Sequence, residues 1–240
     1  MISPYFSKDF VGLQPLSGSL KHKNIFGFDI ETANNKFYCL AITGKNNYYY
    51  YTENKKDFLK ELATNKIYRG SYIVATNLMY DLFGTVPIKK ALKIFSCIEK
   101  AGTLITAKTY ASYDNNDFSL YHPSEIKGHR TNKEKSEYYP ITFIDTLGHL
   151  PASVEYLGKI IGSPKMKSPS YLGKRIPTNK EKPYFKAYNK QDADVSRLFI
   201  EFLQNNYNEL GASLKMTVAS TTLDLFRRKY LLETKKLKKE

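Results

Sequence analysis

An apolar segment that ends in two carboxylates constrains this chain more than any other feature. The segment is Phe26-Gly27-Phe28-Asp29-Ile30-Glu31-Thr32, and its apolar character over residues 24–30 predicts a buried strand. Side chains alternate between the two faces of a strand, so Asp29 and Glu31 lie side by side on one face. Two anions this close repel each other unless a cation lies between them, and a divalent ion with oxygen ligands is the usual solution. The alternative is a solvated strand end with two incidental acids, because short motifs often arise by chance.

Two further acids follow predicted secondary structure elements. Asp81 comes after a short apolar strand at residues 73–75, and Asn77 stands where a turn or a helix start favours asparagine. Asp192 lies in a segment with helical periodicity, where Tyr188 and Asp192 are four residues apart and share one helix face. Each acid has a simpler explanation when it is taken alone. Asp81 would interact with a helix dipole, and Asp192 would be a surface acid on a half-buried helix.

In their order along the chain, these segments resemble the three motifs of the proofreading 3′–5′ exonucleases of the DEDD superfamily. The resemblance is strongest to the exonuclease domain of protein-primed family B DNA polymerases, whose motifs are Asp-x-Glu-Thr, Asn-Leu-x-aromatic-Asp and Tyr-x-x-x-Asp. A fourth element of these domains is Ser/Thr-Leu-x-x-hydrophobic. The four elements stand here at residues 29–32, 77–81, 188–192 and 146–150.

The last motif also distinguishes two branches of the superfamily. A rival branch carries His-x-x-x-x-Asp, but residue 187 is alanine, and Tyr188 takes the role instead. The resemblance covers residues 24–230 and implies an α/β fold in which helices flank a ribonuclease H-like mixed sheet. We expect an N-terminal arm at residues 1–21, the exonuclease domain at 22–212, and a C-terminal helix with a basic tail at 213–240.

The resemblance implies hydrolysis of phosphodiesters with two Mg²⁺ or Mn²⁺ ions. Two ions about 3.5–4 Å apart can activate a water, stabilise the transition state and relieve charge on the departing 3′ oxygen. Carboxylate oxygens suit both metals. By resemblance, Asp29 bridges both ions, Glu31 and Asp192 complete one site, and Asp81 serves the other. Tyr188 orients the attacking water, since a phenol with a pKa of about 10 is a poor base.

The same resemblance implies contacts to the substrate. Tyr80 is expected to stack on a base, and the pair at positions 146 and 147 also matches contacts to a priming terminal protein. A role of Thr146 as a helix cap, after the strand that ends at Asp145, explains this residue equally well. The residues expected to hold the frayed 3′ end or single-stranded DNA are Thr32, Asn77, Tyr80, Thr146 and Leu147.

Members of the family also carry a lysine that neutralises phosphate near the metals. Lys167 is the first candidate for this catalytic role and Lys165 is the second. The hydrophobic residue expected three positions after Lys167 is Ser170, so this element departs from the family pattern.

The composition agrees with a nucleic-acid partner. The 240 residues include 37 basic and 23 acidic side chains, which gives a net charge of +14, and such an excess suits a polyanion. A dense basic patch at residues 227–239 is explained as well by a solvated helix tail as by DNA contact. The cysteines, Cys39 and Cys97, have no metal-ligand spacing, so we expect buried thiols in a reducing compartment.

The sequence contains no apolar run long enough to cross a bilayer, and its start does not resemble a secretory signal. We therefore expect no membrane partner and no secretion. The expected location is cytoplasmic, either in the host cytoplasm of a virus or plasmid or in an organelle matrix.

Periodicity and turn residues predict the order of elements. Residues 103–112 and 117–121 are expected to form a hairpin with its turn at 114–116, and residues 124–138 an exposed loop. Asp145, at the end of its strand, is an additional acid near the sheet edge. Other strands are expected at 24–30, 36–43, 47–52, 72–75 and 140–145, and helices at 55–64, 153–161, 184–206 and 213–232.

Two segments resemble polymerase palm motifs. Residues 117–124 resemble Asp-x-x-Ser-Leu-Tyr-Pro-Ser, and Asp192-Ala193-Asp194 resembles Asp-Thr-Asp. The first has one residue too few before Ser119 and an inserted His122, and the element that belongs between them is absent. We therefore interpret residues 117–124 as a hairpin strand.

The expected function is 3′–5′ exonuclease activity on single-stranded DNA ends during replication or proofreading. The chain would act alone or as the N-terminal part of a polymerase, and its start at Met1 favours a natural N-terminus. Expected partners are the 3′ end of single-stranded DNA and a polymerase module or a terminal protein. One alternative is a non-catalytic module that binds DNA or terminal protein, although a pure binder would not need four acids and a tyrosine. A second is RNA as the substrate, because no motif here reads the 2′-OH.

Overall fold

The computed structural model describes residues 13–112, 114, 117–127 and 137–237. The chain separates into two compact units. The larger unit spans Lys23–Leu203, and the smaller unit combines the described residues of the N-terminal segment, 13–22, with residues 204–237.

The larger unit is built on one mixed sheet. In the described residues its strands are β1 (Ile25–Ala33), β2 (Lys36–Thr43), β3 (Tyr49–Thr52), β4 (Tyr72–Ala75), β5 (Ser96–Lys100), β6 (Thr103–Ser112), β7 (Leu120–Tyr121) and β8 (Tyr138–Asp145). Their order across the sheet is β3-β2-β1-β4-β8-β6-β5, and β7 pairs with β6. The central pairs β1–β4 and β4–β8 are parallel, whereas the remaining pairs are antiparallel.

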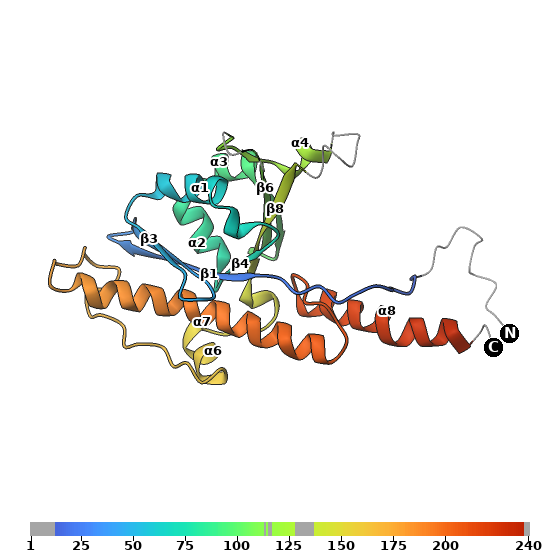
Figure 1. Ribbon diagram of the computed structural model, residues 1–240. Helices are drawn as coiled ribbons and strands as arrows, with labels where there is room; N and C mark the ends of the chain where they lie inside the picture. The colour runs from blue at the N-terminus through green and yellow to red at the C-terminus, as the bar shows by residue number, and fades with distance from the viewer. Residues whose placement is uncertain (1–12, 113, 115–116, 128–136, 238–240) are drawn as a thin grey trace. The chain divides into compact units, whose positions relative to one another are not determined.

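Helices cover both faces of this sheet. Among the described residues of the whole chain, the helices are α1 (Lys55–Thr64), α2 (Leu78–Thr85), α3 (Ile88–Ile94), α4 (Pro123–Lys127), α6 (Val154–Ile160), α7 (Lys182–Glu209) and, in the smaller unit, α8 (Val218–Leu237), with short 3₁₀ turns η1 (Lys66–Tyr68) and η2 (Thr146–Gly148). In the larger unit, α1 and α2 lie on one face and α7 on the other (Figure 1). This arrangement confirms the predicted α/β fold with a mixed sheet flanked by helices.

Strand β1 alternates as its sequence predicts. Phe28 and Ile30 point into the main hydrophobic core, where the Phe28 ring stacks on Phe58 of α1 with 5.0 Å between ring centroids. Asp29 and Glu31 therefore leave the strand on the opposite face, the one that α7 covers. Burial of the apolar face fixes the register of the strand, because a shift by one residue would bring both carboxylates into the core.

The region between β4 and β8 differs most from the sequence-based expectation. Residues 103–112 do pair with Leu120–Tyr121, so the hairpin strand is confirmed. The neighbours of β6 along the main sheet are β8 and β5, however, and β5 and α3 were not predicted. Ala101 and Gly102 form the β5–β6 turn with positive φ, which is unusual for alanine and hid the turn from a search for turn residues.

Two other expectations in this region are only partly covered by the structure. Helix α4 occupies the start of the expected loop at 124–138, and residues 128–136 lie outside the described residues. Of the expected turn at 114–116, only Asp114 is described.

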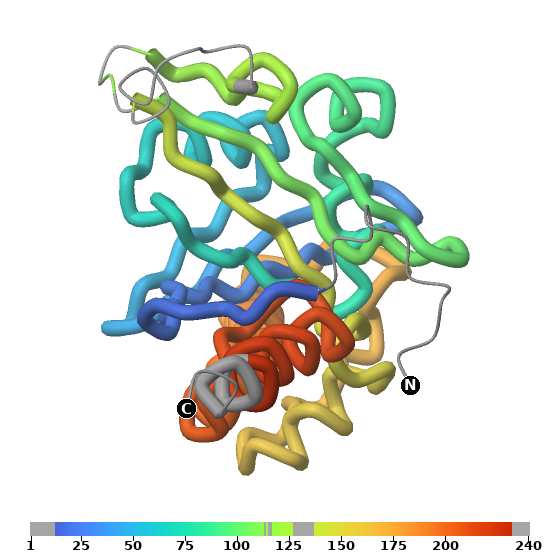
Figure 2. Tube along the Cα trace, turned by 90° about the vertical axis from the view of Figure 1, so that its right-hand side faces the viewer, coloured from blue at the N-terminus to red at the C-terminus, as the bar shows by residue number. Residues whose placement is uncertain are grey.

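The smaller unit joins the N-terminal arm to α8 (Figure 2). Leu16 donates its backbone N–H to Arg227 at 3.1 Å, and Lys21 donates to Ser213 Oγ at 2.9 Å. Arg228 pairs with the buried Asp224 at 2.7 Å, so this part of the basic patch is held in internal contacts. The two units separate at residues 203 and 204 within α7, whereas the sequence suggested a boundary at 212.

No helix among the described residues is both long and apolar enough to span a bilayer. Both cysteines are free, with Cys39 buried and Cys97 half-buried.

Candidate metal centre

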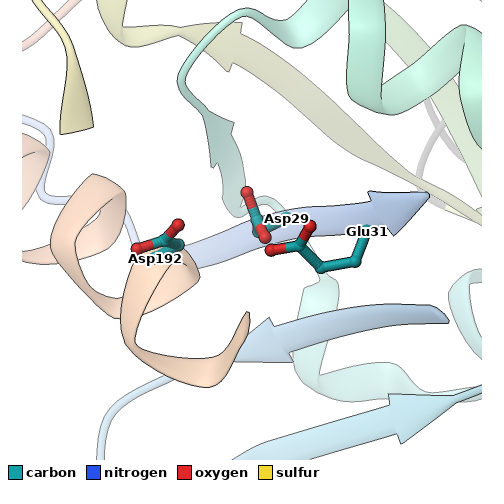
Figure 3. Close-up of side chains that lie close together, drawn as sticks. All are labelled: Asp29, Glu31 and Asp192. Carbon is teal, nitrogen blue, oxygen red and sulfur yellow. The ribbon is translucent and has the colours of Figure 1, made fainter. Parts of the chain in front are cut away.

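Three of the four predicted acids converge between β1 and α7. Asp29, Glu31 and Asp192 each offer one carboxylate oxygen to a cluster in which these atoms all lie within 4.8 Å of one another. Figure 3 shows the two side chains from β1 and the one from α7 gathered around a common space. The helix can approach the strand this closely at Gly27, which has no side chain to hold it away.

The fourth acid, Asp81, lies next to this cluster on α2. It is buried, and its Oδ1 accepts a hydrogen bond from the backbone N–H of Ile30 at 3.3 Å. The bond ties α2 to β1 between the two predicted ligands of that strand. Asp81 is not one of the three residues whose oxygens meet within 4.8 Å, although its charge acts on Asp29.

The four carboxyl groups make one another difficult to ionise. Burial raises the pKa of Asp29 well above its usual range, and repulsion from Asp81, Glu31 and Asp192 raises it further. Burial, together with the charge of Asp192, raises the pKa of Glu31 to about 8. The pKa of Asp81 is also well above its usual range, mainly because the group is buried. A cation held among these groups would reverse this preference and favour the ionised forms.

The side chains fit Mg²⁺ or Mn²⁺ as ligands. All donors are carboxylate oxygens, which these hard cations prefer. Asp192 Oδ1 is buried and has no hydrogen-bond partner. A buried oxygen without a partner is costly, and a cation in the cluster would remove that cost.

A lysine compensates part of the negative charge of the cluster at Asp192. Lys165 Nζ lies 2.5 Å from Asp192 Oδ2, and it also lies over the Tyr188 ring at 4.9 Å from the centroid. Burial alone would lower the pKa of Lys165, but the Asp192 carboxylate outweighs burial and raises it, so the ammonium stays charged.

Of the two candidate lysines, of which the sequence placed Lys167 first, Lys165 is the one whose side chain pairs with Asp192. Gln191 of α7 holds the lysine segment at two points, accepting from Met166 N at 2.8 Å and donating to the Pro164 carbonyl at 2.7 Å. This clamp brings Lys165 to Asp192. At Lys167 the backbone carbonyl accepts from Tyr184 Oη at 2.7 Å.

Tyr188 lies one helical turn before Asp192, as the predicted helix requires. Its ring is buried, and its hydroxyl lies 3.2 Å from Ser168 Oγ. Burial raises the pKa of Tyr188, so the phenol keeps its proton and can act as a hydrogen-bond donor.

Two of the predicted substrate contacts lie together beside the carboxylates. Thr32 Oγ1 and Tyr80 Oη are 2.8 Å apart, and the Tyr80 side chain is 50% exposed. Asn77 is also exposed and adopts a left-handed conformation with φ of 71°, which asparagine tolerates. Its side chain makes no capping hydrogen bond, so it is available to a ligand at the surface.

Helix α2 is capped by Asp145 instead. The carboxylate accepts from Leu78 N at 2.8 Å, from Asn77 N at 3.2 Å and from Leu147 N at 2.9 Å. Asp145 is buried, and its three backbone donors give this acid a structural role at the end of β8.

Thr146 and Leu147 lie in η2, directly after β8. Thr146 is fully buried, and its hydroxyl donates to Thr76 Oγ1 at 3.0 Å. Thr76 Oγ1 lies 2.8 Å from Ser196 Oγ, so the hydroxyl of Thr146 is used inside the protein. Leu147 is half-buried in η2.

An open pocket of about 1050 Å³ adjoins Thr32 and Tyr80. Four apolar side chains line it, with two lysines beside them: Phe37, Met79, Phe83, Ile88, Lys36 and Lys55. Aromatic and basic side chains in one groove are suited to the bases and phosphates of a single strand.

Asn189 is a residue of the site that the motifs did not reveal. Its Nδ2 donates to Asp29 Oδ2 at 2.6 Å from a fully buried position beside Tyr188. Its place between the two motif residues Tyr188 and Asp192 is the only signal in the sequence, and helical spacing alone does not reach it.

Asp194 belongs to a different environment. It forms ion pairs with Lys190 at 2.9 Å and Arg197 at 3.0 Å along α7. Asp194 is not one of the acids of the cluster. Residues 192–194 therefore resemble a palm motif in sequence without placing two acids in the cluster.

No protein-family model and no curated protein matches this sequence. Solved structures do match. Phi29 DNA polymerase complexed with single-stranded DNA aligns with a TM-score of 0.58 and 17% identity, over 90% of this chain and 36% of that chain. The same polymerase complexed with primer-template DNA aligns with a TM-score of 0.59 and 16% identity, over the same shares of the two chains.

The chain thus spans about a third of the length of these structures and shares the fold of that part. They come from the polymerase family whose exonuclease domain the motifs resemble.

Proposed function

We propose that this chain is a metal-dependent 3′–5′ exonuclease that removes nucleotides from single-stranded DNA ends. It would act in replication or proofreading, alone or as the N-terminal part of a protein-primed family B polymerase. The observation that carries the proposal is the convergence of Asp29, Glu31 and Asp192, beside Asp81, in an arrangement whose negative charges a bound cation would stabilise.

Asp29, Glu31, Asp81 and Asp192 would hold two Mg²⁺ or Mn²⁺ ions. When bound, such ions supply an activated water and stabilise the charge on the phosphate and on the leaving oxygen. Tyr188 keeps its phenolic proton and can donate a hydrogen bond at the edge of the cluster. Lys165 adds a fixed positive charge beside Asp192, where the phosphate of the substrate would otherwise meet a net negative site.

The strand end would be placed by the residues beside the cluster. Thr32 and Tyr80 hold each other by a hydrogen bond, which fixes the half-exposed Tyr80 ring as a stacking surface. The neighbouring pocket, whose lining includes apolar side chains and lysines, can take further bases of the same strand. The net charge of +14 would attract the polyanion without selecting a sequence.

The test is degradation of a 5′-labelled single-stranded DNA oligonucleotide with Mg²⁺, with Mn²⁺ and with EDTA. We expect a metal-dependent ladder of shortened 5′-labelled products, and no ladder from the Asp29→Asn/Glu31→Gln double variant. Asp194→Asn is the matched control, because this acid lies on α7 outside the cluster. A substrate blocked by a 3′ phosphorothioate tests the direction, and an RNA oligonucleotide of the same sequence tests the sugar preference.

A non-catalytic DNA-binding module is the second candidate. The net charge and the fold shared with a DNA-complexed polymerase favour DNA binding whether or not the chain cleaves. Tight binding of the labelled strand without any ladder, in Mg²⁺ and in Mn²⁺, would support this alternative over the exonuclease.

A further inference from the structure

We infer that Asn189 is a positioning residue that orients Asp29 in the candidate metal centre, and that Cys39 in turn orients the Asn189 amide. The inference rests on the proposed function, because it treats Asp29 as a ligand for the metal ions. It concerns two residues whose identity none of the motifs specifies.

The geometry joins three elements through buried side chains. Asn189 on α7 donates from Nδ2 to Asp29 Oδ2 on β1 at 2.6 Å. Cys39 on β2 donates from Sγ to Asn189 Oδ1 at 3.8 Å. Both Asn189 and Cys39 have no exposed surface, so water does not replace either contact.

Cys39 determines which way the amide faces. The Cys39 thiol donates from Sγ, and a thiol donor requires the amide oxygen of Asn189 on its side. The NH₂ group is then turned toward Asp29. A flipped amide would place its oxygen against the carboxylate and leave both acceptors unpaired.

The contact fixes the rotation of the Asp29 carboxylate. With one oxygen tied to Asn189, the free lone pairs keep a constant direction toward the space shared with Glu31 and Asp192. A neutral amide achieves this without adding a positive charge that competes with a cation. Asp192, in contrast, is held by the positive charge of Lys165. Asp29 and Asp192 are therefore oriented by different kinds of interaction.

One helical turn of α7 therefore carries three functions. Tyr188 presents its phenol, Asn189 orients Asp29, and Asp192 provides a ligand oxygen. Residues that hold a metal ligand in place commonly contribute about 10–100-fold to metal affinity.

The experiment measures Mn²⁺ binding by electron paramagnetic resonance titration of the full chain without DNA, and kcat and KM on single-stranded DNA. Asn189→Leu removes the hydrogen bond at similar volume. We expect Mn²⁺ affinity to fall about 10–100-fold, and kcat to fall more than KM rises. Cys39→Ala should lose part of the affinity, and Cys39→Ser, which keeps a donor, should restore it.

Thr109→Val controls for loss of stability, because it removes the partly buried hydrogen bond from Thr109 on β6 to the Tyr121 carbonyl on β7. If Asn189→Leu lowers the melting temperature as this control does but keeps wild-type Mn²⁺ affinity and kcat, the positioning role is overturned and the proposed function stands. If the wild-type chain neither binds Mn²⁺ nor cleaves, the proposed function itself fails, and the inference fails with it.

Discussion

The carbonyl oxygen of Ala193 lies 1.9 Å from the position that a Cβ atom on Gly27 would occupy. No side chain fits there without moving the helix backbone away from the strand. Gly27 stands two residues before Asp29, and Ala193 follows Asp192 directly. This contact between β1 and α7 therefore sets the separation of the carboxylates that the two elements carry.

Gly27→Ala should lower stability and metal affinity more than the small volume of the added methyl group suggests. The added methyl group meets rigid backbone, so β1 and α7 must separate, and overpacking of this kind costs about 1–3 kcal/mol. We expect a lower midpoint in urea unfolding and weaker Mn²⁺ binding by the folded protein.

Gly84→Ala is a matched control for this substitution. A Cβ at Gly84 would lie 2.4 Å from Ile30 Cδ1, the end of a flexible side chain that can turn aside, and alanine favours the helix. We expect Gly84→Ala to leave Mn²⁺ affinity near wild type. Equal losses of affinity in the two variants would show that the backbone contact at Gly27 has no special role.

Asp145→Ala should destabilise the fold but leave the cleavage activity of the folded protein nearly unchanged. The carboxylate accepts from the backbone of Leu78, Asn77 and Leu147, and loss of a capping side chain costs about 0.5–2 kcal/mol. We expect a loss of about 2 kcal/mol, at the upper end of that range, because three donors lose their partner in a buried place. Urea unfolding measures the loss, and cleavage per folded molecule should stay within a few-fold of wild type. A complete loss of cleavage in fully folded Asp145→Ala would instead place this acid in the active centre.

The position of the carboxylates could be predicted because it follows from local periodicity. A period of two in β1 placed Asp29 and Glu31 on one face, and a spacing of four in α7 placed Tyr188 with Asp192. The order of the motifs then supplied the fold, and the mixed sheet agrees with it.

Other features depend on contacts between distant segments, which periodicity does not encode. Lys165 pairs with Asp192 from a segment that Gln191 holds by hydrogen bonds at Pro164 and Met166. In sequence, Thr146 matches a position that binds DNA in the family it resembles. Its hydroxyl nevertheless donates a hydrogen bond to Thr76, which comes 70 residues earlier. The β5–β6 turn was missed because it places an alanine at positive φ.

Lys165→Met and Lys167→Met should separate the two lysine candidates. Lys165 pairs with Asp192 at 2.5 Å, so its loss removes the positive charge beside the cluster. We expect kcat on single-stranded DNA to fall about 10²-fold for Lys165→Met, as for loss of one group that stabilises charge in a transition state. Lys167→Met should change kcat by less than about threefold.

Salt dependence provides a check that both methionine variants share. If either lysine only attracts the DNA backbone, its replacement raises KM and reduces the slope of log KM against log salt, with kcat unchanged. A larger loss of kcat for Lys167→Met than for Lys165→Met would reverse the assignment.

The stability of the metal-free protein should depend on pH through Glu31. Its pKa is raised from an ordinary value of 4.5 to about 8, so the folded state binds the proton more tightly than the unfolded chain. The stability gained from this proton is fully present below pH 4.5 and is lost as the pH rises through about 8. The slope reaches at most about 1.4 kcal/mol per pH unit for one proton.

Glu31→Gln isolates this effect from the general repulsion of a chain with net charge +14, which weakens as the pH rises. The free energy of unfolding in EDTA, measured by urea titration from pH 5 to pH 8.5, should fall for the wild type relative to Glu31→Gln. Mg²⁺ binds the ionised carboxylates, so it should stabilise the wild type most at the alkaline end and Glu31→Gln much less. If the two proteins keep a constant difference across this range in EDTA, then Glu31 ionises normally, and the repulsion that calls for a cation in the cluster is absent.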